Sequence, residues 1–352
     1  MDLSLSNNTH FHFVCTNYGS SKDGIGHFTS KIVKALRKTS ALKITRYSAE
    51  THHLSKLQLF FSMRMTSELL RLKRALQNNS DENYIILEYP FVEYNPLFLV
   101  VLYSIKSKKK RKPIIVISLH EYSRTKLFRK LFIKLLIPIS DIVLYTKEED
   151  VKPFLNSKTI FKKRIIPANI EPSHRKTITP STSVHICFFG IINFQTKEIT
   201  PMIQAWEQYL EKNGDNRIVF HFITSSLHPD IKENKSLKYH FDLDDDEVST
   251  LLHDMHCMIL PLKPNISTNN GSLAVCCRHE CLPVSVFDTR YFKDDFGLRM
   301  KNYSVAEFVT VYETINSLDF ETLTSMSELA YQYGKEMSIQ NSAKAYLELA
   351  SL

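Results

Sequence analysis

The sequence predicts an α/β protein with two doubly wound parallel-sheet domains and C-terminal helices. Short apolar runs alternate with helical segments along the chain, and the alternation restarts near residue 184. A chain of 352 residues is also too long for one ordinary core. We place the domains at 1–172 and 173–325, with a boundary in the polar segment 170–183. The helix or helices of 326–352 could pack back on the first domain.

In the first domain, an apolar strand at 11–16 leads through a turn with Gly24 and Gly26 into a helix over 30–37. Further apolar runs are the remaining strands expected there, at 84–88, 114–119, 142–145 and 164–166. Helical segments separate most of these runs, so we expect the strands to pair in parallel.

The second domain repeats this pattern. Helices are expected at 201–211 and 244–253, and the second has acidic residues in its first turn, as the helix dipole favours. The expected strands are the apolar runs at 184–189, 218–224, 239–241, 258–262 and 284–287. The final segment, 320–352, is helical and no strand follows it.

Composition favours a soluble globular protein, since 43% of the residues are hydrophobic and 23% are charged. No apolar run reaches the roughly 18 residues that a membrane span needs. The N-terminus lacks the basic start and apolar stretch of a signal peptide. The six cysteines have no disulfide-framework spacing, which is typical of a reducing compartment. We therefore expect a cytoplasmic protein.

Charge divides unevenly along the chain. Residues 1–175 contain 30 Lys and Arg against 14 Asp and Glu, a net charge of +16, whereas the remainder has 15 against 23, a net charge of −8. The segment Arg124–Pro138 reads as a basic amphipathic helix, with Leu127, Leu131, Leu135 and Ile137 near one stripe. Such a helix suits an anionic membrane surface, although an ordinary solvated basic face has the same composition. Nucleic acid is not expected, because no interleaved aromatic platform or known motif accompanies the charge.

The segment Leu260–Asp288 is the most informative one for function. A short apolar run precedes the polar loop 263–270, and Gly271-Ser272 then opens a helix over 273–281. A small-residue loop that leads into a helix exposes backbone N–H groups at the positive end of the helix dipole, which suits a phosphate. An ordinary helix cap between two strands has the same pattern.

Three loops should meet at the carboxyl ends of the strands, where open parallel sheets bind ligands. They are the glycine turn Asp23–His27, the His120-Glu121-Tyr122 segment and the loop Lys263–Ser272. His120 ends a buried strand, so it needs a polar partner there. It is either a site residue or a structural histidine bonded to the backbone.

A zinc site is not expected in the cysteine-rich helix. Cys277 and Cys281 lie four residues apart on one helical face, with Cys276 and His279 close by, but paired CxxC knuckles are absent. Free cysteines also pack well as small hydrophobic residues.

Seven segments together resemble the retaining nucleotide-sugar glycosyltransferases of glycosyltransferase family 4, which have the GT-B fold. In the first half they are DGIGHFTSKIVKAL, YIILEYPF, VISLHEYSR, DIVLYTKEEDVKPF and RIIPANI. In the second half they are HICFFGIINFQTKEITPMIQAW and DLDDDEVSTLLHDMHCMILPL, the latter followed by NGSLAVCCRHECLPVSVF. The resemblance implies two Rossmann-like domains that face a central cleft, with the acceptor in the first and the nucleotide sugar in the second.

The chain departs from the family's usual pattern at its charged residues. Thr268 and Cys276 stand where the family commonly has two glutamates, and Ile191 stands where it commonly has an arginine. The loop is closer to a subgroup that lacks the paired glutamates. Lys197 and Lys263 are then the cations that could face a diphosphate, and we expect one of them to do so.

The resemblance also implies roles for individual residues. His120 and Glu121 are the expected catalytic residues, and His27, Tyr122 and Arg124 are expected to bind the acceptor. The donor-binding residues are expected to be Gly24, Ile25, Gly26, Lys197, Thr224, Ser225, Tyr239, Lys263, Thr268, Asn269, Asn270, Gly271 and Ser272. No metal or other cofactor is expected, because backbone N–H groups and a lysine would stabilise the leaving diphosphate.

The implied activity is a retaining hexosyl transfer from a nucleotide diphosphate sugar to a lipid-linked or oligosaccharide acceptor. The implied setting is synthesis of bacterial cell-surface polysaccharide such as O-antigen or capsule, at the inner face of the cell membrane. Two alternatives stay open. The missing glutamates and arginine are compatible with a catalytically weakened partner or scaffold protein, and nucleotide-sugar epimerases share the two-domain architecture.

Overall fold

The chain folds into two compact units in this computed structural model. The first comprises Met1–Ile165 and Ile339–Leu352, and the second comprises Ile166–Ser338. The sequence-based boundary at 172/173 lies a few residues inside the second unit. The structure describes the residues 8–20, 23–51, 54–77, 79–89, 95–107, 112–120, 122, 127–176, 182–213, 217–225, 236–263, 265–266, 268, 270–292 and 296–351.

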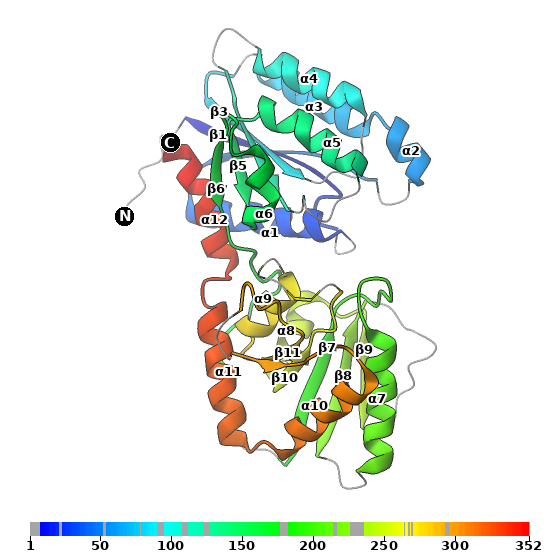
Figure 1. Ribbon diagram of the computed structural model, residues 1–352. Coiled ribbons are helices and arrows are strands. Elements are labelled where there is room, and N and C mark those ends of the chain that lie inside the picture. Colours follow the sequence, from blue (N-terminus) through cyan, green and yellow to red (C-terminus); the bar gives the residue numbers. More distant parts are fainter. Residues whose placement is uncertain are drawn as a thin grey trace. The chain divides into compact units, whose positions relative to one another are not determined.

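The first unit is a six-stranded parallel sheet with helices on both faces (Figure 1). Its strand order is β2-β1-β3-β4-β5-β6, which reverses direction at β1. The strands are β1 (Thr9–Thr16), β2 (Lys43–Ala49), β3 (Glu82–Tyr89), β4 (Ile114–Leu119), β5 (Ile142–Tyr145) and β6 (Ile160–Lys163).

Two separate apolar layers cover this sheet. On one face pack α1 (Gly24–Thr39) and the C-terminal α12 (Ile339–Leu347). On the other face pack α3 (Arg64–Ala75), α4 (Pro96–Lys106) and α5 (Leu127–Leu136). The shorter helices α2 (Lys56–Phe61) and α6 (Glu148–Val151) complete the unit. The last helix of the chain thus belongs to the first sheet's core.

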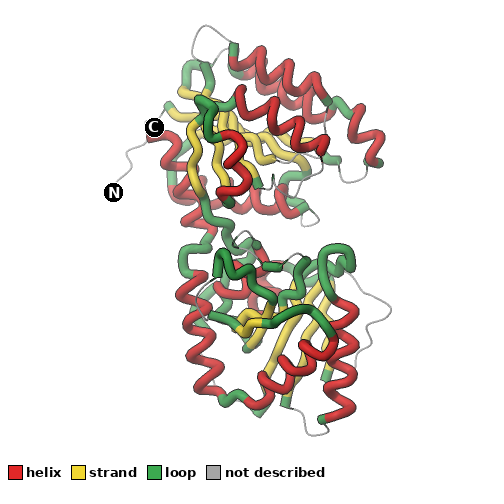
Figure 2. The backbone as a smooth tube through the Cα atoms, viewed as in Figure 1, coloured by secondary structure: helices red, strands yellow, loops and turns green. Residues whose placement is uncertain are grey.

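The second unit is likewise a sheet, yellow in Figure 2, with helices, in red, packed against it. Its strand order is β12-β11-β10-β7-β8-β9. Its strands are β7 (Val184–Phe189), β8 (Ile218–Thr224), β9 (Leu237–Phe241), β10 (Cys257–Ile259), β11 (Leu282–Ser285) and β12 (Leu298–Arg299). One face packs against α7 (Ile199–Lys212) and α10 (Val305–Ser317). The other packs mainly against α8 (Asp245–His253), α9 (Gly271–Arg278) and part of α11 (Phe320–Gly334).

These two doubly wound parallel sheets confirm the predicted fold class. The predicted strand at 164–166 is wrong, because β6 ends at Lys163 and the side chain of Arg164 is buried in a polar network. The strand β2 was not predicted, since its sequence KITRYSA has too few apolar residues to stand out. Among the helices of the described ranges, none is long and apolar enough to cross a membrane.

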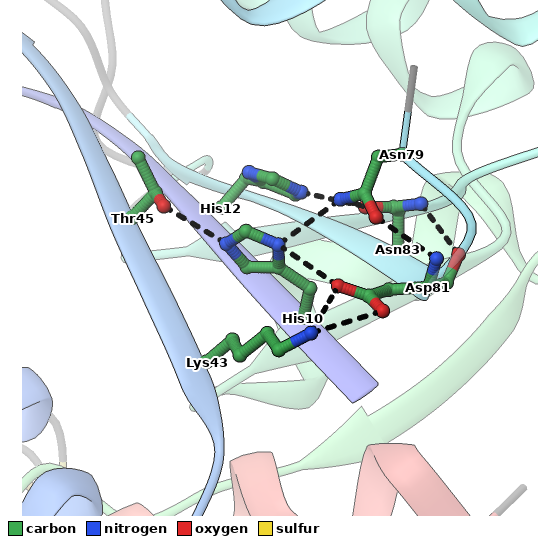
Figure 3. A network of polar contacts seen from close by, with 7 residues as sticks. All are labelled: His10, His12, Lys43, Thr45, Asn79, Asp81 and Asn83. Carbon is green, nitrogen blue, oxygen red and sulfur yellow. Dashed lines mark hydrogen bonds and ion pairs between the residues drawn. The ribbon is translucent and has the colours of Figure 1, made fainter. Parts of the chain in front are cut away.

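A polar network ties together the amino-terminal ends of β1, β2 and β3 (Figure 3). His12 Nε2 lies 2.8 Å from Asn83 Oδ1, and His10 Nε2 lies 2.8 Å from Thr45 Oγ1. The Asn79 amide donates to both His10 Nδ1 and Asn83 Oδ1. Because the Asn79 amide donates to His10 Nδ1, His10 carries its proton on Nε2, and His12 donates from its own Nε2 to Asn83. The network therefore fixes the register of these three strands at their amino-terminal ends, away from the carboxyl ends.

Candidate functional site

In the second unit, three segments converge where β7 ends. Gly190 follows β7, and its N–H donates to Ile223 O on β8 over 3.0 Å. Its φ of +117° is a conformation that side chains rarely adopt. A Cβ atom at Gly190 would lie 3.0 Å from Lys197 Nζ and 3.9 Å from Ser272 Oγ. Gly190 therefore leaves space between a lysine and the first turn of α9.

Lys197 is the cation held beside this space. Its Nζ donates to Ile191 O over 2.7 Å and lies 4.7 Å from the centre of the Phe188 ring. Burial lowers the pKa of Lys197 to about 8. Within the described part of the chain, no carboxylate pairs with it, so its positive charge is not neutralised by an acidic side chain.

Lys263, the other expected cation, has an acidic partner. Its Nζ lies 2.7 Å from Glu198 Oε1, and its backbone N–H donates to Thr196 O. The Glu198 N–H in turn donates to Pro261 O. Lys263 thus links the loop after β10 to the loop before α7. Of the two lysines, Lys263 is paired with a carboxylate, and Lys197 is not within the described residues.

The start of α9 supplies backbone donors next to Lys197. Asn270 is the N-cap, and its side chain accepts from Leu273 N over 2.9 Å. The N–H groups of the first turn have no partners inside the helix, and the helix dipole makes them attractive to an anion. A Cβ atom at Gly271 would meet no atom of the described residues within 4 Å, and its φ is not left-handed. Among these residues, nothing covers Gly271.

The neighbouring strand end presents one buried polar atom. Thr224 ends β8 and is 6% exposed, and its Oγ1 has no hydrogen-bond partner among the described residues. Ser225 follows it and is exposed, while Thr268 is half-buried. Tyr239 lies elsewhere, since its ring stacks on Phe222 at 6.1 Å and packs against the core face under α7 and α10. Asn269 lies outside the described residues.

In the first unit, the glycine turn is shaped by a close backbone approach. A Cβ atom at Gly26 would lie 2.0 Å from Asn17 O, so only glycine fits there. Asp23 caps α1, and its carboxylate accepts from Ile25 N and Gly26 N at 3.0 and 3.1 Å. These two N–H groups therefore already have an anionic partner within the chain. Gly24 faces open space.

A buried charge network surrounds His120 at the ends of β3, β4 and β6. Glu88 on β3 is fully buried, and its Oε2 accepts from His120 Nε2 over 3.0 Å. Its Oε1 accepts from the hydroxyl of Tyr346 on α12 over 2.8 Å. Arg164 Nη2 lies 3.1 Å from His120 Nδ1, and its guanidinium covers the ring of Phe28 on α1 at 4.8 Å.

The network keeps Glu88 ionised and His120 neutral. Burial alone would raise the pKa of Glu88, but the hydrogen bond from His120 and the positive charge of Arg164 hold it below its usual value. Burial and the charge of Arg164 lower the pKa of His120. The His120 side chain is 13% exposed, whereas that of Glu88 is not exposed. His120 is therefore the solvent-facing end of a buried, charge-balanced network.

The other residues expected at this edge have different surroundings. Tyr122 packs on Phe154 in the core below α5 and is 7% exposed. His27 lies half-buried in the first turn of α1. Glu121 and Arg124 lie outside the described residues.

The sequence analysis missed one residue of the site at the end of β7, Gly190. It also missed three residues of the network around His120, which are Glu88, Arg164 and Tyr346. A glycine directly after a buried strand and a glutamate inside an apolar strand were the available signals for the first two. Nothing in the local sequence marks Arg164 or Tyr346, which reach the network from distant segments.

No protein-family model matches the chain. No curated protein matches it. Solved structures do. One is an α,α-trehalose-phosphate synthase (UDP-forming) from Burkholderia xenovorans in complex with glucose-6-phosphate, which is 8% identical with a TM-score of 0.64 over 98% of this chain and 100% of that one.

Two more solved structures resemble the chain over nearly its whole length. An E. coli trehalose-6-phosphate protein bound with UDP-2-fluoro glucose is 11% identical, with a TM-score of 0.62 over 97% of this chain and 98% of that one. The S. aureus MnaA–UDP structure is 9% identical, with a TM-score of 0.61 over 98% of both chains. At these identities the similarity establishes the fold, and it confirms the two-domain GT-B fold.

Proposed function

We propose that this protein is a glycosyltransferase that takes a sugar from a nucleotide diphosphate sugar. The observation that carries the proposal is the convergence of Gly190, Lys197 and the open first turn of α9 at one edge of the second sheet. A glycine that makes room, a lysine without an acidic partner among the described residues and the N–H groups at a helix start together suit a diphosphate.

The groups at this edge of the second sheet can stabilise negative charge on a leaving diphosphate. Breaking the bond between the sugar's anomeric carbon and the diphosphate oxygen leaves the bonding electron pair on the diphosphate. The N–H groups of Gly271 and Ser272 and the ammonium of Lys197 would stabilise that charge as it develops, without a metal ion. The acceptor hydroxyl forms the new bond to the anomeric carbon and gives its proton to the departing diphosphate oxygen. Thr224, whose buried hydroxyl has no hydrogen-bond partner in the described part of the chain, would bind the nucleoside.

In this proposal the first unit binds the acceptor and His120 contacts the sugar or the reacting centre. The contacts with Glu88 and Arg164 keep the imidazole neutral and hold its ring in place. Retention of configuration, a lipid-linked or oligosaccharide acceptor and work at the inner membrane surface complete the proposal. They rest on the family resemblance and on the basic character of the first half of the chain.

A panel of nucleotide sugars and nucleoside diphosphates, beginning with UDP and GDP forms, tests this function by thermal shift. A ligand that binds the folded protein raises the melting temperature, by an amount that grows with its concentration above Kd. We expect one nucleotide series to do so and its sugar donor to be hydrolysed slowly. Interconversion of free nucleotide sugars would instead identify an epimerase, and binding of none of them would identify a scaffold protein.

A further inference from the structure

The outer side of α5 is apolar although it faces solvent. Phe132, Ile133 and Leu136 pack into the core of the first unit. The opposite side of the same helix is covered by large hydrophobic side chains that are 52 to 83% exposed, namely Leu127, Phe128, Leu131 and Leu135. Large apolar side chains that gather on the solvent side of a helix mark an interaction surface.

The neighbouring helix α4 continues the apolar surface. Phe98 on α4 lies 6.4 Å from Phe132 on α5 between ring centres, so the two helices are in contact on the same face of the sheet. The outward side chains of α4 are 48 to 64% exposed, and they are Leu97, Val100 and Tyr103. We call the outward residues of both helices, Leu97, Val100, Tyr103, Leu127, Phe128, Leu131 and Leu135, the α4–α5 face.

Charge on these helices has a single sign. Neither α4 nor α5 contains an aspartate or glutamate, whereas α5 carries Arg129, Lys130 and Lys134. Lys134 is exposed, and Lys130 is half-buried with its ammonium 5.6 Å from the Tyr122 ring centre. Long basic side chains beside an apolar stripe can place their charges at lipid headgroups while the stripe enters the acyl region.

We propose that the α4–α5 face docks the first unit on an anionic lipid bilayer. A second copy of this chain is a poorer occupant, because pairing two such faces would bring their basic side chains together without any acidic residue to balance them. An anionic bilayer supplies both the apolar phase and the negative charge. The proposal agrees with a lipid-linked acceptor, but the docking itself does not depend on the transferase activity.

Cosedimentation with vesicles tests the docking, using phosphatidylcholine mixed with phosphatidylglycerol and phosphatidylcholine alone. Wild-type protein should bind the anionic vesicles and bind more weakly in high salt. The double variant Leu127→Gln/Leu131→Gln should bind at least about tenfold more weakly, because two exposed apolar side chains are lost. Its melting temperature should be unchanged, since both side chains are exposed. The same substitution at Leu329, which is 51% exposed on α11, is the apolar control and should have no effect.

A charge pair completes the design. Lys130→Gln/Lys134→Gln should weaken binding about tenfold, whereas Lys34→Gln/Lys38→Gln should have little effect, because α1 lies on the opposite face of the sheet. If both lysine pairs weaken vesicle binding equally, the protein is attracted by its net charge alone, and the proposal of a docking face is wrong. Concentration-dependent dimers that the Leu127/Leu131 variant abolishes would identify a protein interface instead. Nucleotide should raise the melting temperature of all these variants equally. A failure of membrane docking can therefore be distinguished from a failure of the proposed function.

Discussion

Replacing Lys197 by alanine should weaken nucleotide diphosphate binding strongly, while replacing Lys263 should not. A hydrogen bond from a charged donor contributes about 1.5–3 kcal/mol, which corresponds to a Kd roughly 10- to 150-fold higher when the donor is removed. Lys263 is the matched control because it lies in the same region but pairs with Glu198 at 2.7 Å. Its removal should change Kd by less than about threefold.

The pH dependence of binding gives a second signature of Lys197. Burial lowers the pKa of its ammonium to about 8 in the free protein, and a bound diphosphate would raise it again. Below pH 8 the lysine is already charged, so affinity should be nearly constant there. Above pH 8 binding must be accompanied by proton uptake, and affinity should fall by up to about tenfold per pH unit. Lys197→Ala should remove this dependence.

Isothermal titration calorimetry measures both effects. Titrations at pH 7 and 9, in buffers of different ionisation enthalpy, give Kd and the number of protons taken up on binding. A Lys263→Ala protein that loses more affinity than Lys197→Ala would refute the assignment of the cation. Equal proton uptake by wild type and Lys197→Ala would show that another group titrates.

Three further predictions concern the first unit. His120→Ala should lower kcat by about 100-fold or more with a smaller change in KM, and normal turnover would remove His120 from the site. Gly26→Ala should lower the melting temperature markedly because its Cβ would collide with Asn17 O, whereas Gly24→Ala, which faces open space, should not; similar melting temperatures would contradict the close approach. Burial lowers the pKa of His12 to about 4, so the folded state keeps it neutral while the unfolded chain takes up a proton below about pH 6.5. Urea unfolding should therefore show stability that is complete above pH 6.5 and falls by up to about 3 kcal/mol towards pH 4, and an unchanged slope in His12→Gln would contradict this origin.

The sequence predicted most strands because a buried parallel strand is a short continuous apolar run. The segments 114–119, 142–145, 184–189 and 218–224 were predicted with the bounds that the structure has. The strand β2 was missed because it lies at the sheet edge with several polar residues, so its pairing with β1 stabilises it more than its own composition does.

The candidate site was less predictable because it depends on contacts between distant segments. Sequence patterns indicated His120, but Tyr346 and Arg164 approach it only after α12 and β6 have packed on the same sheet. The two lysines are equivalent in sequence, and the ion pair of Lys263 with Glu198 and the burial of Lys197 distinguish them only in the folded protein. The amphipathic pattern of α5 indicated a leucine stripe, but its orientation away from the core depends on Phe132 and Ile133, which fill the inner side.

Calorimetry on Gly271→Val tests most directly whether the start of α9 binds the donor's diphosphate. A Cβ atom at Gly271 meets no atom within 4 Å in the described part of the chain and its φ is ordinary, so the variant should fold with a nearly unchanged melting temperature. The valine would instead fill the open space that the diphosphate needs. We predict that binding of the bare nucleoside diphosphate and of the whole nucleotide sugar is lost to the same extent, because the lost contacts are to phosphate. A folded Gly271→Val protein that binds the diphosphate as tightly as wild type would contradict the account.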